Sequence, residues 1–237
     1  MPTTMNKQHT VTTLLNVLQK KYDPPEPEAR PVLEQLMYAA LREGATRAQA
    51  DKAFKKLVES FFDWNEIRVS QPQEVAEKLG DLPDAGAKAQ RIVGLLQEVF
   101  ETTYSFKLDE IDKKGLKNAA KQLSRMQDST DFIVAWVLQR SLSGHAIPLD
   151  NPTLRVLRRL GLIEGDDDNL ESIRATLEHL VPKAKGPVFS DAVSQLAKEI
   201  CVENNPHCSS CPLKGECPTG QMRLAASESR SSRPKPR

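Results

Sequence analysis

The sequence predicts an all-α fold, from its composition and from the spacing of its apolar residues. Aromatic residues make up only 5% of the chain, whereas Leu, Ala, Gln, Glu, Lys and Arg, which favour helices, are plentiful. Apolar residues recur three and four positions apart along nearly every segment, which is the period of a helix with one buried face. No stretch shows the sustained alternation of β-branched and polar residues that indicates a strand.

The expected helices follow one another along the chain as apolar stripes. Thr46, which precedes one stripe, is a possible helix cap, and another stripe follows Asp84. Each stripe is long enough for a helix that packs one face against a core. The stripes span residues 33–41, 54–62, 92–100, 154–160, 173–180 and 188–200.

The segment from Phe132 to Leu138 differs from the others because it is apolar on all sides. A helix of this kind is usually buried at the centre of a domain. A residue between Asp128 and Thr130 could cap its beginning, and Gly144 could end it. We therefore expect the neighbouring helices to pack around it.

The charge of the chain is nearly balanced, with a formal net charge of +1. Residues 218–237 hold five basic residues against one acid, a net of +4, so the rest of the chain sums to −3. This basic tail is rich in Ser, Pro and Arg, and we expect it and the polar residues 1–8 to be disordered. A nucleic-acid footprint must then be a local patch on a near-neutral body.

The 237 residues suit one large domain or two small ones. No apolar run approaches the ~20 residues that a membrane span needs. The beginning of the chain lacks a secretory signal pattern. We expect a cytoplasmic protein with no membrane partner.

All four cysteines fall in one short segment, with the spacing C-x6-C-x2-C-x5-C. Clustered thiols in a cytoplasmic protein bind metal more often than they form disulfides. Structural zinc sites usually use two close pairs of ligands separated by a longer spacer, and here only one pair is close. The compact loop therefore favours a [4Fe–4S] cluster held by four thiolates, with zinc as the alternative. The predicted ligands are Cys201, Cys208, Cys211 and Cys217.

Two short motifs around these cysteines resemble the cluster loop of the endonuclease III and adenine-mismatch glycosylase family of DNA repair enzymes. These motifs are Pro206-His-Cys208 and Cys211-Pro-Leu213. Further upstream, the segment from Leu149 to Gly161 resembles the part of the family in which an Asp opens a helix that continues with Arg-Val and later Leu-Gly. The segment Lys88-Ala89-x-x-Ile92 is similar to another family helix. The resemblance covers roughly residues 30–217.

This resemblance implies two helical units, as in the helix-hairpin-helix DNA glycosylases, with a C-terminal [4Fe–4S] cluster loop. One is a six-helix unit over residues 30–144. The other is an iron–sulfur unit made of residues 9–29 plus 145–217. The implied partner is double-stranded DNA, and we expect a monomer.

Asp150 stands where the family has its catalytic carboxylate. The residues alone also allow a plain helix start, because Pro152 suits the first helical position and Asn151 the N-cap. Arg155, Arg158 and Arg159 share the helix that follows, and could contact DNA phosphates or form an ordinary polar face.

Two positions depart from the family pattern. Counting back from Asp150 places Met126–Thr130 at the family's Gly-rich hairpin turn, whose backbone N–H groups hold a DNA phosphate. The turn has no glycine here, and Asp128 and Asp131 would repel a phosphate. Phe132 stands in place of the lysine that attacks the sugar in bifunctional members, and Phe cannot form a Schiff base.

The sequence therefore predicts a monofunctional DNA N-glycosylase that flips and removes a damaged or mispaired base without lyase activity. One alternative is a non-catalytic iron–sulfur protein that binds DNA or a partner and derives from the same family. A zinc-stabilised helical adaptor is the third hypothesis. The nearby lysines at 113, 114, 117 and 121 are expected to form a solvated face.

Overall fold

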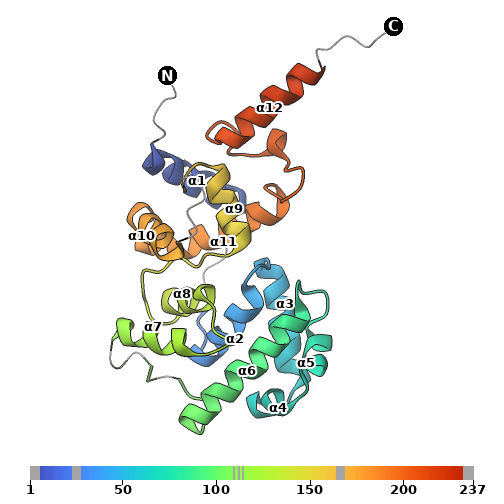
Figure 1. The fold of residues 1–237 in the computed structure, drawn as a ribbon, viewed down its shortest axis with the longest axis vertical. Helices are drawn as coiled ribbons and strands as arrows, with labels where there is room; N and C mark the ends of the chain where they lie inside the picture. Colours follow the sequence, from blue (N-terminus) through green and yellow to red (C-terminus); the bar gives the residue numbers. More distant parts are fainter. Residues whose placement is uncertain are drawn as a thin grey trace. The chain divides into compact units, whose positions relative to one another are not determined.

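The structure, a computed structural model, describes residues 6–22, 28–108, 110–111, 113, 115–163 and 169–231. Within these residues the secondary structure is entirely helical, which confirms the predicted all-α class (Figure 1). The chain divides into two compact units, which we call the central unit (Glu26–Asp150) and the terminal unit (Met1–Pro25 with Asn151–Arg237). No helix in the described part of the chain is long and apolar enough to cross a membrane.

The helices of the central unit follow one another in sequence. Short turns join most of them, and α6 is the longest, at 19 residues. These helices are α2 (Val32–Arg42), α3 (Arg47–Ser60), α4 (Trp64–Val69), α5 (Pro72–Leu79), α6 (Ala85–Thr103), α7 (Leu116–Arg125) and α8 (Asp131–Arg140).

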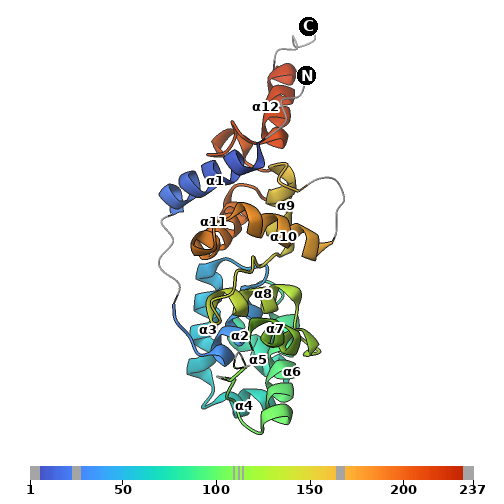
Figure 2. The same ribbon diagram turned by 90° about the vertical axis from the view of Figure 1, so that its left-hand side faces the viewer.

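Helix α8 is buried within the central unit, as its all-round apolar sequence predicts. Its residues from Phe132 to Val137 are buried, and α2 and α7 pack against it (Figure 2). Trp136 stacks on Phe132 with the ring centroids 5.7 Å apart. The Trp136 indole N–H donates to Gln35 Oε1 of α2 over 3.1 Å, so its polar atom is satisfied inside the core.

The terminal unit is built around α11, which packs against α1 and α9. Leu18, Leu157 and Phe189, one from each of these three helices, are fully buried. The helices are α1 (Lys7–Tyr22), α9 (Asn151–Arg159), α10 (Leu170–Leu180), α11 (Gly186–Glu199) and α12 (Pro218–Ser231), with 3-10 turns at Lys183–Lys185 and Cys208–Ser210.

Two segments that the sequence predicted to be disordered contain helix instead. Helix α1 begins at Lys7, inside the predicted disordered residues 1–8, and residues 1–5 lie outside the described part. Helix α12 covers most of the predicted basic tail, and residues 232–237 lie outside the described part. A proline at its start and, after Thr219 and Gly220, a run of Gln, Met, Arg, Leu and Ala favour a helix. Helix α12 also packs on α9 and on the Cys208–Ser210 turn.

Residues 145–150 belong to the central unit, although the sequence placed them with the cluster-bearing unit. Two hydrogen bonds, one local and one long-range, connect this segment to the central unit. Gln139 Nε2 of α8 donates to the Ala146 carbonyl over 2.7 Å, and Asp150 accepts a hydrogen bond from Gly44. Sequence patterns do not reveal these two hydrogen bonds, because periodicity identifies buried apolar faces and not the partners of polar groups.

Candidate functional site

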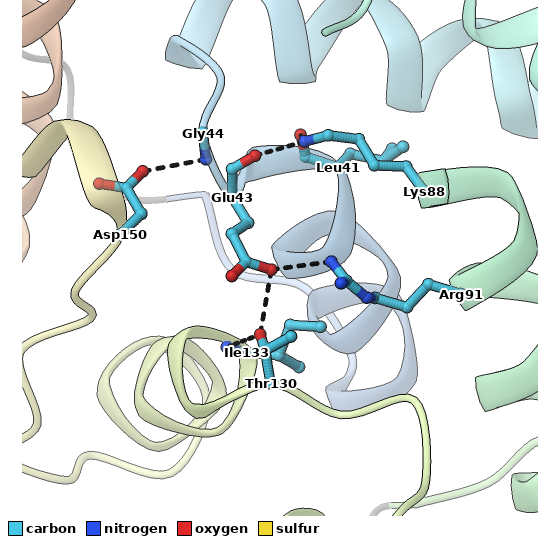
Figure 3. Close-up of polar contacts among 8 residues, drawn as sticks. All are labelled: Leu41, Glu43, Gly44, Lys88, Arg91, Thr130, Ile133 and Asp150. Carbon is cyan, nitrogen blue, oxygen red and sulfur yellow. Dashed lines mark hydrogen bonds and ion pairs between the residues drawn. The ribbon is translucent and has the colours of Figure 1, made fainter. Parts of the chain in front are cut away.

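Asp150 ends the segment that connects α8 to α9, and its side chain is only 6% exposed. Its Oδ2 accepts a hydrogen bond from the backbone N–H of Gly44 over 2.9 Å (Figure 3). Gly44 is 106 residues away in sequence and lies in the turn between α2 and α3. A backbone N–H cannot rotate as a side chain does, so the contact orients the carboxylate.

The turn that presents Gly44 is fixed by a buried lysine. Lys88 of α6 donates from Nζ to the carbonyl of Leu41 over 2.7 Å and also to the carbonyl of Glu43. These carbonyls lie at the end of α2, where no further turn of helix is present to bind them. Lys88 is 3% exposed, and this burial lowers its pKa to about 8 because the charged form loses its hydration.

The side chain of Glu43 connects the same turn to the beginning of α8. Its Oε2 accepts from Arg91 Nη1 of α6 over 2.9 Å and from Thr130 Oγ1 over 3.0 Å (Figure 3). Thr130 is the N-cap of α8, since its Oγ1 accepts from the Ile133 N–H over 3.2 Å. The predicted cap between Asp128 and Thr130 is therefore confirmed as Thr130.

Sequence reasoning gave no role to Glu43 or Arg91. It noted Lys88 only as part of a family resemblance, although a physical signal was present. Lys88 lies on the same helical face as Ile92 and Leu95, a lone cation on an apolar stripe. A lysine in that position must find polar partners inside the fold.

Two of the three arginines predicted to reach DNA, Arg155 and Arg159, bind the chain itself. Arg155 donates from Nε to the Cys201 carbonyl over 3.0 Å and from Nη2 to the Ala197 carbonyl over 2.9 Å. Arg159 donates to the carbonyls of Val202 and Glu203 over 2.7 and 2.9 Å, respectively. These bonds satisfy the carbonyls that end α11 and begin the cysteine loop. Arg158 is half-buried on the same helix.

The cysteine loop brings its thiols to one shared pocket, which Arg159 also lines. Arg159 Nη1 lies 3.4 Å from the Sγ of Cys201, and the Gly220 N–H donates to the Sγ of Cys217 over 3.2 Å. Burial raises the pKa of the Cys211 thiol, and the neighbouring thiols of Cys201 and Cys208 raise it further. All four cysteines are half-buried and unpaired by disulfides. Among the described residues, no three donor groups are placed to hold a single metal ion.

Sequence comparison relates the chain to known DNA repair proteins, although no family model matches it. It is 24% identical to an endonuclease III of Thermotoga maritima over 182 residues, which cover 77% of this chain and 80% of that protein. It is 32% identical to an endonuclease III homolog of Encephalitozoon cuniculi over 73 residues, 31% of this chain and 30% of that protein. The chain thus spans most of the first relative but under a third of the second.

Solved structures share the fold. A non-covalent endonuclease III–DNA complex superposes with a TM-score of 0.71 at 21% identity, covering 92% of this chain and 98% of that one. A thermostable thymine-DNA glycosylase gives a TM-score of 0.65 at 18% identity, covering 91% and 97%. The chain is a divergent relative of endonuclease III. Helices α7 and α8 and the turn between them, which we call the hairpin, contain the segment that the sequence resemblance assigns to the family's hairpin turn.

The structure describes most of the hairpin residues at which the sequence departs from the family pattern. Phe132 is 4% exposed and stacks on Trp136 within the core, and its phenyl side chain carries no amine. Lys113, Lys117 and Lys121 are exposed, as expected of a solvated face, and Lys114 lies outside the described residues. The turn Met126–Thr130 closes through a hydrogen bond from the Ser129 N–H to the Met126 carbonyl over 3.0 Å.

Proposed function

We propose that the protein is a monofunctional DNA N-glycosylase that removes a damaged or mispaired base from double-stranded DNA. The observation that carries this proposal is Asp150, a buried carboxylate oriented by the Gly44 N–H at the position that the family resemblance assigns to catalysis. A residue serving only as a helix cap would need no partner from the distant α2–α3 turn.

The chemistry follows from where charge develops. When the bond between a flipped base and its sugar breaks, positive charge builds on the sugar. A carboxylate held close to that charge stabilises it and can orient the attacking water. In this chain Asp150 supplies the carboxylate, and Gly44 keeps it from reorienting.

Strand cleavage is not part of the proposed reaction. Lyase chemistry needs an amine that attacks the sugar carbon and forms a Schiff base. Phe132 occupies the position where bifunctional relatives carry that amine, and it is buried against Trp136. The product is therefore an abasic site in an intact strand.

We also propose that Cys201, Cys208, Cys211 and Cys217 hold a [4Fe–4S] cluster. The donor set fits, because the four thiols line one pocket and backbone and guanidinium N–H groups approach two of their sulfurs. Such N–H contacts stabilise cluster-bound thiolates. When bound, the cluster ties the loop into one structure. Anaerobically purified protein should contain about four irons per chain, and one zinc per chain would contradict this assignment.

Base release from duplexes that carry different lesions tests the catalytic proposal. Alkali treatment after incubation converts each abasic site into a strand break. Asp150→Asn should abolish release on every duplex that the wild type processes, while duplex binding remains. Asp63→Asn is the matched control, because Asp63 is an exposed N-cap of α4 in the same unit and Asn caps helices equally well. Full activity of Asp150→Asn would overturn the proposed role.

A non-catalytic DNA-binding protein of the same descent is the second candidate. It is favoured by the turn Met126–Thr130, which contains no glycine, and by Phe132, which supplies no amine. Wild-type protein that binds duplex DNA and releases no base from any lesion tested would select this candidate.

A further inference from the structure

The turn between α3 and α4 exposes aromatic side chains that the core of the central unit does not cover. Phe62 is 94% exposed, and Val58, in the last turn of α3, is 43% exposed. Phe61 and Trp64, close to Phe62 in sequence, are each partly exposed. Single exposed apolar residues are common on protein surfaces, whereas neighbouring ones indicate an interaction surface.

The four side chains line one groove, which Ile67 and Glu34 also line and which we call the aromatic groove. Its volume is about 200 Å³. Pockets for small molecules begin at about 300 Å³, so this groove is better suited to the side chains of a docked peptide. Part of its wall is fixed in advance, because the Trp64 ring packs on Phe54 with the centroids 6.4 Å apart and Ile67 is 2% exposed.

The charge at the aromatic groove is negative. Glu34, in the first turn of α2, is partly exposed and forms no ion pair in the described part of the chain. Among the residues that the structure describes, no basic one lines the groove. A peptide that binds here should therefore combine apolar side chains with positive charge, whereas an acidic peptide or a phosphate backbone would be repelled.

The end of this chain has the required composition. The described residues finish with α12 at Ser231, and the last six residues of the sequence read Ser-Arg-Pro-Lys-Pro-Arg. They hold three cations and no acid. Aromatic-lined grooves are known binding sites for peptides with closely spaced prolines, because little conformational entropy is lost when such peptides bind. We call residues 233–237 the tail segment.

We propose that the aromatic groove of one copy of this chain binds the tail segment of a second copy. The proline rings pack against the exposed aromatic side chains, and a flanking Lys or Arg pairs with Glu34. A contact of this size is small, so the association is weak and the expected monomer persists in dilute solution. This inference goes beyond base excision and requires no step of it.

Sedimentation of the full chain from about 10 µM to about 1 mM, the range of weak complexes, tests the association. The average mass of the wild type should rise across this range. Phe62→Ala should keep the chain monomeric, because truncation of a central aromatic residue weakens an interface by about tenfold or more. Val69→Ala is the matched control and should associate as the wild type does, since Val69 is 61% exposed on α4 but does not line the groove.

A labelled peptide of residues 228–237 identifies what the groove binds. Its anisotropy should rise when the full chain is added, and binding to Phe62→Ala should be roughly tenfold weaker. Glu34→Gln should weaken binding roughly two- to fivefold, the range of one exposed charge pair. Glu77→Gln is the matched control, because it removes an exposed charge from α5 of the same unit, and it should leave binding unchanged.

Three outcomes would overturn the proposal. Equal binding of a peptide that carries Pro234→Ala and Pro236→Ala would mean that the contact depends on charge alone. Association that survives deletion of the tail segment would mean that two grooves meet each other. A constant monomer mass, with peptide binding only after deletion of the tail segment, would mean that the segment occupies the groove of its own chain.

These measurements stand apart from the catalytic proposal, because they use neither DNA nor base release. A protein that releases a base but stays monomeric at every concentration keeps the glycosylase and loses this inference. A protein that releases no base but associates through Phe62 keeps this inference and loses the glycosylase.

Discussion

At the residue scale, Gly44 and Lys88 fix the backbone conformation of the turn between α2 and α3. Gly44 directly follows the C-cap of α2 with φ at +68°, a left-handed conformation that glycine adopts at little cost. Lys88 then satisfies the carbonyls of the same turn. Together they hold the Gly44 N–H in the orientation that Asp150 requires.

The lowered pKa of Lys88 should appear as a pH-dependent difference in the free energy of unfolding between the wild type and Lys88→Met. Between pH 8 and the ordinary lysine pKa of 10.5 the unfolded chain holds a proton at Lys88 that the folded chain has released. The free energy of unfolding of the wild type should therefore rise with pH relative to the variant. The change over this window should be on the order of 3 kcal/mol, measured by urea unfolding at several pH values.

The comparison needs a lysine that stays in water. Lys55→Met is suitable, because Lys55 is an exposed residue of α3 that pairs with Glu59 across one helical turn. Its stability difference from the wild type should change much less with pH. A pH-independent difference for Lys88→Met would mean that the buried amine keeps its ordinary affinity for protons.

At the scale of the element, one residue of the hairpin, Thr130, makes two contacts with different parts of the central unit. Thr130 caps α8 with its oxygen and donates its hydroxyl hydrogen to Glu43. The turn contains no glycine, and contacts to α6 and to Glu43 hold its conformation. An exchange of Thr130 for glycine would thus damage the turn rather than restore a phosphate site.

Thr130→Ala should lower the free energy of unfolding of the central unit by about 1–2 kcal/mol, because α8 loses its N-cap and Glu43 loses one partner. Tryptophan fluorescence during urea unfolding measures this, since both Trp64 and Trp136 lie in the central unit. Thr130→Ser keeps the hydroxyl and should lose much less. Equal losses in the two variants would show that the Thr130 methyl group, not the cap, carries the stability.

At the scale of the whole molecule, the chain joins two units with separate cores. The cysteine loop lies entirely in the terminal unit, which contains no tryptophan. Loss of the loop's structure should therefore affect one unit more than the other. The fluorescence of the central unit and the total helical signal report the two effects separately.

Cys208→Ser should abolish binding of the proposed cluster and weaken the terminal unit, because metal binding contributes directly to the folding of small loops. Circular dichroism at 222 nm should show part of the helix melting early, while the fluorescence transition stays near that of the wild type. Ser209→Ala, the neighbouring exposed residue, is the control. A fluorescence transition that moves as far as the helical signal would mean that the two units unfold together.

The sequence by itself determined the all-α class, the central burial of Phe132–Val137 and the cap of α8 to within three residues. These features follow from local periodicity and from short-range capping preferences, which neighbouring residues encode. It also singled out Asp150 and the cysteines, because their spacing matches a known family. It misjudged residues 218–231, where the helical preference of Gln, Met, Leu and Ala outweighs the Ser and Arg content.

Only the tertiary structure decided which partners these residues meet. Several of these partners are backbone groups, which every sequence contains: the Gly44 N–H, the Leu41 carbonyl and the Gln127 N–H. The amino-acid sequence therefore does not distinguish them from other backbone groups. Arg155 and Arg159 looked like phosphate ligands because a basic helix face is the same in sequence whether it meets DNA or a carbonyl. The contact between Gly44 and Asp150 joins residues 106 positions apart and forms only when the core has packed. For that reason it could not be predicted from the sequence.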